Sequence, residues 1–175
     1  MRRLPENKYA LLEWERRFLL DRFPSEVEIT RVRGLFDRYI DGTNLRLRRQ
    51  VDKQETQFKL TQKLRGDGAG ALQGLITNLY LTESEFHLLE KLPAKLLQKT
   101  RYSVPPFGID VFENELQGLV LAEAEFNSAE EAANLALPSF MAHEVTTDLR
   151  FTGGELVRTS RQELNKWLEE FGMRL

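Results

Sequence analysis

Two glutamates and an arginine alternate along the stretch Leu11–Leu20, where single residues separate Glu13, Glu15 and Arg17. Side chains of a β-strand point to opposite faces in turn, so these three charged groups would share one face. Paired carboxylates offer the hard oxygen ligands that suit Mg²⁺ or Mn²⁺, and a guanidinium grips phosphate oxygens. The spacing therefore favours metal-assisted chemistry on a phosphorylated molecule, although one such strand alone is also typical of a solvated sheet face.

The same alternation recurs in four later stretches, at 45–48, 57–63, 98–102 and 120–126. Strand parity places these basic side chains on the charged faces: Arg17, Arg46, Arg48, Lys59, Lys63, Lys99 and Arg101. The acidic side chains placed there are Glu13, Glu15, Asp110, Glu123 and Glu125. Like charges gathered in a low-dielectric interior destabilise a fold unless water, counterions or a ligand compensate them. The pattern therefore predicts a bound polyanion together with a divalent cation.

Such a site could carry out phosphoryl or nucleotidyl transfer, in which the protein positions the phosphate chain and a metal ion polarises an oxygen. A zinc site is disfavoured because the chain has no cysteine and its only histidines are His87 and His143. The competing interpretation is a structural lattice of salt bridges, which would pair each acid with a base. The surplus of bases over acids in the charged set argues against it.

Length and composition limit the alternatives. The 175 residues suit a single domain, 1–175, with 1–8 as a frayed lead-in and 160–171 as a C-terminal helix. A formal net charge of −2 provides no field to attract a nucleic-acid duplex or an anionic membrane. With no membrane-spanning run, no signal-peptide core and no cysteine, we expect a cytoplasmic protein. The sequence leaves a homodimer open.

Three capping boxes, in which Ser or Thr precedes Glu by three residues, begin at Thr82, Ser128 and Ser160. The predicted helices cover about 82–91, 128–137 and 160–171. In the last of them the apolar residues recur at helical spacing, at Leu164, Trp167, Leu168 and Phe171. We expect this helix to pack its apolar stripe on the outside of a sheet.

The remaining chain reads mainly as strands with polar connections. Strands are expected at 11–20, 35–40, 45–50, 57–64, 75–81, 97–104, 107–112 and 118–126. A glycine-rich stretch at 65–74 lacks the Gly-Lys-Ser/Thr ending of a phosphate-binding loop and is interpreted as a mobile loop. Strands with apolar outer faces and charged inner faces, covered by helices, describe an α+β fold in which a closed antiparallel β-barrel encloses a polar bore.

Residues Glu13 to Leu19 resemble the amino-terminal Glu-x-Glu-x-Lys signature of the CYTH superfamily, also called the triphosphate tunnel metalloenzymes. The resemblance continues in order through blocks at 45–48, 58–61, 99–102, 110–112, 118–126 and 144–151. It covers most of the chain from about Tyr9 to Phe151, and the bacterial tripolyphosphatase-like members are the most similar. The family implies a closed antiparallel barrel of about eight strands that forms a tunnel.

By this resemblance the substrate would be a small molecule that contains a triphosphate, and the cofactor would be Mg²⁺ or Mn²⁺. The expected catalytic residues are Glu13, Glu15 and Arg17. The residues expected to bind substrate are Arg46, Arg48, Lys59, Lys63, Lys99, Arg101 and Arg150. The expected metal ligands are Glu13, Glu15, Asp110, Glu123, Glu125 and Asp148. Asp148 and Arg150 would lie near the closing end of the tunnel.

The sequence departs from the family's pattern at three places. Arg17 replaces the signature lysine, Gly108 stands where an acid is common, and 75–81 offers only Thr77 and Asn78 where many members carry Arg and Glu. We expect divalent-metal-dependent hydrolysis of inorganic triphosphate or a similar linear triphosphate. The alternatives are a class IV-type adenylate cyclase, a thiamine-triphosphatase-like activity, or a module that binds polyphosphate or nucleotides without turnover.

Overall fold

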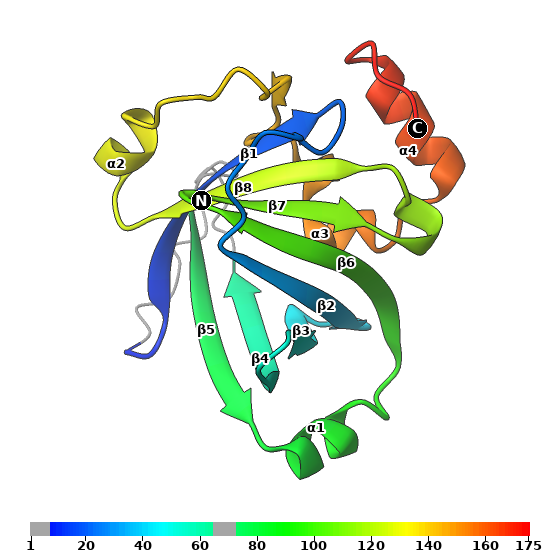
Figure 1. Ribbon diagram of the computed structural model, residues 1–175. Helices are drawn as coiled ribbons and strands as arrows, with labels where there is room; N and C mark the ends of the chain where they lie inside the picture. Colours follow the sequence, from blue (N-terminus) through cyan, green and yellow to red (C-terminus); the bar gives the residue numbers. More distant parts are fainter. Residues whose placement is uncertain (1–7, 65–72) are drawn as a thin grey trace, which may run out of the picture.

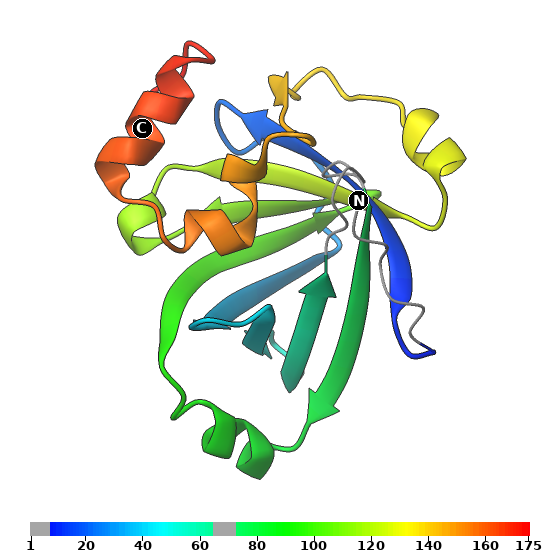
Figure 2. The ribbon, with the colours of Figure 1, turned by 180° about the vertical axis from the view of Figure 1, so that it is seen from behind.

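The computed structural model describes residues 8–64 and 73–175 (Figures 1 and 2). The strands are β1 (Leu11–Leu20), β2 (Arg31–Ile40), β3 (Leu45–Val51), β4 (Thr56–Leu64), β5 (Gln73–Leu81), β6 (Ala94–Val104), β7 (Phe107–Phe112), β8 (Val120–Phe126) and β9 (His143–Glu144). The α-helices are α1 (Glu83–Leu89), α2 (Ala129–Ala133), α3 (Gly153–Leu156) and α4 (Arg161–Glu169), and the 3-10 helices are η1 (Asn114–Leu116) and η2 (Leu149–Phe151). The predicted lead-in, except for Lys8, and most of the glycine-rich stretch lie outside the described residues.

The strands form one antiparallel sheet in the order β5-β4-β3-β2-β6-β7-β8-β1, and β1 pairs again with β5 to close the ring. The expected closed barrel is therefore confirmed. Only the first part of β1, Leu11–Trp14, pairs with β5. Further along β1 the same edge takes the short strand β9, which pairs with Phe18 and Leu19.

The turn between β2 and β3 sets the register of two strands that line the bore. Gly42 in this turn has a φ of 71°, a left-handed conformation that glycine adopts without a steric cost. The resulting register places Tyr39 opposite Arg46 and Asp37 opposite Arg48. Side chains of opposite residues in an antiparallel pair lie on the same face, so each pair can meet inside the barrel.

Two apolar cores hold the barrel together. On the outer face, side chains such as Phe18, Ile109 and Ala122 are buried beneath the chain that follows β1 and α2. The second core lies at one end of the bore, where residues from the inward faces of four strands meet the C-terminal segments. Its main members are Leu19, Leu97, Phe112, Leu121, Phe151, Leu156, Leu164 and Leu168.

This second core corrects the expected position of the last helix. Leu164 and Leu168 of α4 are fully buried against Leu19 and Leu121, which share strand faces with the charged residues of the bore. The helix therefore packs across the end of the barrel and not on the outer face of the sheet (Figure 1). Sequence periodicity identified the apolar stripe of the helix but carried no information about which surface it covers.

The helix starts at Thr82 and Ser160 have complete capping boxes, as predicted. The helix that follows Ser128 is shorter than expected and ends at Ala133 instead of near Leu137. There Glu131 accepts a hydrogen bond from the backbone of the preceding Asn127, so the cap is not reciprocal. In the described part of the chain, no helix combines the length and apolar character that a membrane span needs.

Candidate active site

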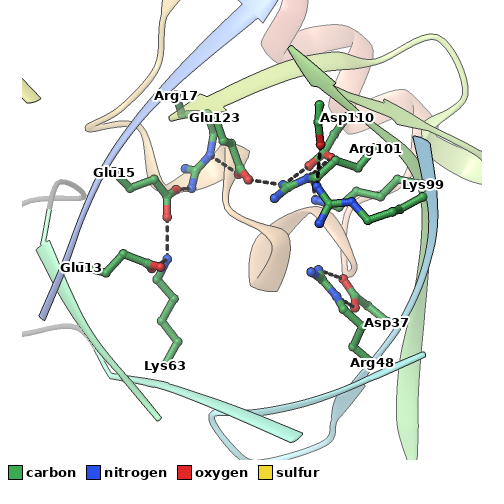
Figure 3. A network of polar contacts seen from close by, with 12 residues as sticks. Glu13, Glu15, Arg17, Asp37, Arg48, Lys63, Lys99, Arg101, Asp110 and Glu123 are labelled. Atoms are coloured by element: carbon green, nitrogen blue, oxygen red, sulfur yellow. Dashed lines mark hydrogen bonds and ion pairs between the residues drawn. The ribbon is translucent and has the colours of Figure 1, made fainter. Parts of the chain in front are cut away.

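The barrel encloses a cavity of about 940 Å³. Its lining includes the predicted residues Glu13, Glu15, Arg17, Arg46, Arg48, Lys59, Lys63, Lys99, Arg101, Glu123 and Glu125. These side chains come from β1, β3, β4, β6 and β8, so alternate positions on well-separated strands converge on one space (Figure 3). The structure thus brings together most of the charged set that strand parity selected.

One side of the cavity, here called the acidic wall, consists of Glu13, Glu15 and Arg17 on β1 and Glu123 and Glu125 on β8. The pairing of β1 with β8 sets Glu15 opposite Glu125 and Arg17 opposite Glu123. The Arg17 guanidinium lies between two carboxylates, in contact with Glu15 and 3.0 Å from Glu123 Oε1. The Arg17 side chain is therefore fixed by the two glutamates beside it on the acidic wall.

Lys63 of β4 reaches over the intervening strand β5, beside Gly74, to the same wall. Its Nζ lies 3.1 Å from Glu13 Oε2 and 2.5 Å from Glu15 Oε2, so one ammonium bridges two carboxylates (Figure 3). A cation between these two glutamates shows that their oxygens can converge on a single positive charge.

The two glutamates of β8 differ in their electrostatics. Burial tends to raise the pKa of Glu123, but Lys99, Arg17 and Arg101 outweigh it and hold that pKa well below its usual range. Glu125 is exposed to the cavity, and partial desolvation inside the barrel raises its pKa, which the neighbouring carboxylate of Glu13 raises further. The acidic wall thus has one fully compensated carboxylate and one that is repelled by its neighbour.

The opposite side, here called the basic wall, consists of the cavity-lining cations of β2, β3, β4 and β6, which are Arg33, Arg46, Arg48, Lys59, Lys63, Lys99 and Arg101. Asp37 on β2 lies beneath it and accepts two hydrogen bonds from Arg48, at 2.6 and 2.7 Å. Despite complete burial, Arg48 and then Arg46 hold the pKa of Asp37 far below its usual range. Asp37 therefore fixes the Arg48 side chain. It was not among the predicted site residues.

Asp110 on β7 holds the side chains of Lys99 and Arg101 as Asp37 holds that of Arg48. It is fully buried, contacts Lys99, and accepts from Arg101 at 2.6 Å. Arg101 also reaches Glu123 on the acidic wall, again at 2.6 Å. A Cβ at Gly108 would lie 3.2 Å from Arg101 Nε, so the missing side chain lets the guanidinium lie against the backbone. The glycine at this position thus makes room for the Arg101 guanidinium.

The basic wall keeps positive charge that its acids do not compensate. Burial, followed by Arg48 and Arg46, lowers the pKa of Lys59 to about 8. The Nε atoms of Arg33 and Arg46 are buried and have no hydrogen-bond partner among the described residues. Positive charge of this kind favours a bound anion in the cavity, because the anion would compensate it.

Comparisons with known proteins agree with this arrangement. An inorganic triphosphatase of Nitrosomonas europaea is 32% identical over 148 residues, which cover 81% of this chain and 93% of that protein. The chain belongs to the CYTH superfamily. No family model matches the chain. Two crystal structures of a protein named NE1496 are also similar, one described as a hypothetical protein and one as an inorganic triphosphatase. They show 26% and 25% identity with TM-scores of 0.55 and 0.54, and the match covers 85% and 84% of this chain and 99% and 95% of theirs.

In this CYTH protein three predicted site residues do not line the cavity. Asp110, expected as a metal ligand, is buried behind Lys99 and Arg101, and the other two are Asp148 and Arg150. Arg150 pairs with Asp148 at 2.7 Å and with Glu170 of the C-terminal region at 2.8 Å, and neither Asp148 nor Arg150 lines the cavity. Asp148 also accepts from the Arg150 backbone and caps η2. These contacts join the segment after β9 to the end of α4. The sequence alone does not distinguish this structural role from a role in the tunnel.

The segment after η2 supplies cavity residues that sequence reasoning missed. Thr152, Gly153, Gly154, Glu155 and Arg158 line the cavity beside the β2–β3 turn. A Cβ at Gly153 would collide with the Tyr39 hydroxyl, so glycine allows α3 to approach β2 this closely. The Gly153-Gly154 pair is the sequence signal that could have pointed to this close approach.

A divalent cation fits the chemistry of the acidic wall. Glu13, Glu15 and Glu125 offer only carboxylate oxygens, the ligand type that Mg²⁺ and Mn²⁺ prefer. The raised pKa of Glu125 beside Glu13 shows a repulsion that a divalent ion would relieve. Within 8–64 and 73–175, no three acidic or histidine side chains are already gathered around one point. Lys63 would therefore have to withdraw from Glu13 and Glu15 for the metal to bind.

Proposed function

We propose that this protein hydrolyses inorganic triphosphate inside the barrel with the help of a divalent cation, Mg²⁺ or Mn²⁺. The observation that carries the proposal is the cavity itself, in which uncompensated cations face a cluster of carboxylates from the opposite strands. The similarity to an inorganic triphosphatase supports the same substrate.

The basic wall would hold the phosphate chain. Arg48 and Arg101 are fixed by buried aspartates and present their remaining donors to the cavity, whereas Lys59 contributes a movable ammonium. Arg46 and Lys99 extend this set along the bore. Because these cations come from different strands, they could surround a linear polyanion on several sides and keep it extended.

Glu13, Glu15 and Glu125 would hold the metal, with Glu123 and Arg17 behind them as a rigid support. When bound, the metal would polarise a phosphate oxygen and lower the pKa of a coordinated water. In the reaction the water oxygen forms a bond to the terminal phosphorus, and the bond from that phosphorus to the bridging oxygen breaks. Pyrophosphate leaves, one proton of the water stays on orthophosphate, and the other goes to solvent.

The test is a substrate panel with purified protein and Mg²⁺ or Mn²⁺. Phosphate release would be measured from triphosphate, pyrophosphate, ATP and thiamine triphosphate, and cyclic AMP would be measured in the ATP reaction. Release mainly from inorganic triphosphate supports the proposal. Release mainly from thiamine triphosphate, or formation of cyclic AMP, would replace it with another activity.

A second candidate function is binding of polyphosphate or nucleotides without turnover. It is favoured by the way in which Arg17 and Lys63 engage Glu15, since carboxylates tied to cations are poor metal ligands. Tight binding of triphosphate in calorimetry, with no phosphate released from any substrate of the panel, would select this function.

A further inference from the structure

The outer face of the barrel carries a second cavity, of about 700 Å³, which has no lining residue in common with the cavity inside the bore. It lies between α1 and the outer faces of β2, β3, β4 and β6, at the opposite end of the molecule from α4 (Figure 1). Its lining includes three phenylalanines and two arginines, which are Phe36, Phe58, Phe86, Arg38 and Arg49. Sites for small molecules usually occupy about 300–1,000 Å³, so this cavity has a suitable size.

The strand registers build the floor of this outer cavity. They set Gln98, Phe36, Arg49 and Phe58 side by side in one row across β6, β2, β3 and β4. The row faces outwards because its members alternate along each strand with the residues of the lumen. Phe58 packs against Phe86 of α1 with ring centroids 4.7 Å apart, and the Arg49 guanidinium lies 4.5 Å from the centroid of Phe36. Phe36 and Phe58 are only half-buried, so the floor offers aromatic surface to a ligand.

The arginines of the outer cavity are not paired with its acids. Among the described residues Arg49 forms no ion pair, and Arg38 makes one long hydrogen bond, from Nη2 to a backbone carbonyl at 3.4 Å. The carboxylates of Glu83 and Glu90 on α1 instead contact His87, at 3.6 and 2.6 Å. Arg49 is exposed, so its N–H donors are accessible. Guanidinium groups with free donors can hold a phosphate or a carboxylate by charge-assisted hydrogen bonds.

We propose that the outer cavity binds a small molecule in which a planar aromatic ring carries an anionic group, either a phosphate, as in a nucleoside monophosphate, or a carboxylate. The three phenylalanines would bury the ring, and Arg38 and Arg49 would hold the anionic group. An apolar molecule would leave the guanidinium groups unused, and a bare phosphate would leave the aromatic floor uncovered. The inference does not depend on the proposed function, because the two cavities are lined by different residues.

The test measures binding by calorimetry in buffer with EDTA, with and without an excess of inorganic triphosphate. Four probes are compared: AMP and benzoate carry both a ring and an anionic group, whereas adenosine and inorganic phosphate each carry one of the two. AMP or benzoate should bind, and adenosine and phosphate should bind more weakly by about a factor of ten or more. The tighter of the first two probes identifies the anionic group. If neither binds, if adenosine or phosphate binds as tightly, or if triphosphate abolishes the binding, the inference is overturned.

Variants show whether the cavity lining holds the probe. Arg49→Gln should weaken binding of the tighter probe about tenfold, as expected for the loss of one charge-assisted hydrogen bond. Phe36→Leu should weaken it about fivefold through the loss of an aromatic contact. Arg31→Gln is the matched control, because it removes an exposed arginine of β2 that lines neither cavity, and it should have no effect. Melting curves confirm that the variants fold. Equal affinities of Arg49→Gln and Arg31→Gln would refute the site.

Amide resonances of the isotope-labelled protein locate the bound probe. AMP or benzoate should shift the amide signals of α1, which borders the outer cavity, and leave those of β1 and β8 unchanged, since these two strands carry the acidic wall of the bore. Shifts in β1 and β8 without shifts in α1 would place the probe in the bore and refute the outer site. Absence of phosphate release in the substrate panel, with binding at α1 intact, would refute the proposed function alone.

Discussion

The acidic and basic walls of the tunnel compensate their charge in different ways. On the acidic wall the carboxylates are met by cations inside the cavity, because Arg17 lies between Glu15 and Glu123 and Lys63 bridges Glu13 and Glu15. On the basic wall, the fully buried Asp37 and Asp110 pair with Arg48 and Arg101 from behind. The remaining N–H donors of the two arginines are left to the cavity. By this geometry an anion would meet the basic wall as it stands, whereas a metal would first have to displace Lys63.

The largest effect is expected on the basic wall, from removal of one partner of its buried ion pair. Arg48→Met leaves the Asp37 carboxylate buried without its main partner, which should cost about 3 kcal/mol in the free energy of unfolding and also weaken triphosphate binding. The double variant Asp37→Asn/Arg48→Met should recover much of the stability but not the binding. Denaturant unfolding and calorimetry measure the two effects. Recovery of both would mean that Arg48 has only a structural role.

On the acidic wall, Glu13→Gln keeps the shape of the side chain but removes one proposed metal ligand. Turnover of triphosphate should fall roughly 100-fold, while triphosphate binding in EDTA changes little. Initial rates with Mn²⁺ and calorimetry provide the two measurements. If binding in EDTA falls as much as turnover, the acidic wall contacts the substrate directly and the division between the walls is wrong.

A comparison of the two cavity lysines of β4 tests whether Lys63 competes with the metal. Lys63→Met should raise the affinity of the protein for Mn²⁺ about tenfold, because the carboxylates of Glu13 and Glu15 lose their resident cation. Lys59→Met removes the same charge from the same strand at a residue that forms no ion pair with a glutamate in the described part of the chain, and it should raise the affinity much less. Electron paramagnetic resonance of Mn²⁺ reports binding without turnover. Equal gains in Mn²⁺ affinity for the two variants would mean that removal of any cavity cation helps the metal to bind, and that Lys63 does not compete with it specifically.

The smallest effect concerns pH. Because burial and two arginines lower the pKa of Lys59 to about 8, its ammonium is lost as pH rises through that value, and triphosphate binding should weaken severalfold. Lys59→Met should remove this dependence. The free energy of unfolding should instead increase as pH rises from about 8 to 10.5. In this range the unfolded chain still holds the Lys59 proton that the folded protein has released. Calorimetry and unfolding from pH 7 to 10 measure both, and a binding curve unaffected by Lys59→Met would contradict this pKa shift.

Alternation of side chains made the barrel wall predictable from the sequence. A period of two residues determines which face of a strand each residue occupies, so Glu15, Arg48, Arg101 and Glu125 could be placed on one lining before the pairing of the strands was known. The closed barrel with a polar bore was likewise predicted from these faces, and the resemblance implied the same fold with about eight strands.

The missed residues depend on register and long-range packing. Asp37 sits in the predicted strand at 35–40, but its importance comes from lying opposite Arg48, which the β2–β3 turn decides. Arg158 enters the cavity lining because α3 folds back beside Tyr39, a contact between distant parts of the chain. The resemblance placed Asp148 and Arg150 near the closing end of the tunnel, whereas the structure pairs them with each other and Arg150 with Glu170, which depends on where their segment docks.

The position of the apolar cores has a consequence for how this scaffold could change. Hydrophobic packing is concentrated on the outer face and at one end of the barrel, so the polar lining contributes comparatively little of the burial that drives folding. Exchange of lumen side chains that form no ion pair within the described residues, such as Arg33 and Lys59, should therefore alter ligand preference at small cost to folding. The apolar residues that stabilise the barrel can therefore stay constant while substitutions in its lumen change the ligand that the protein binds.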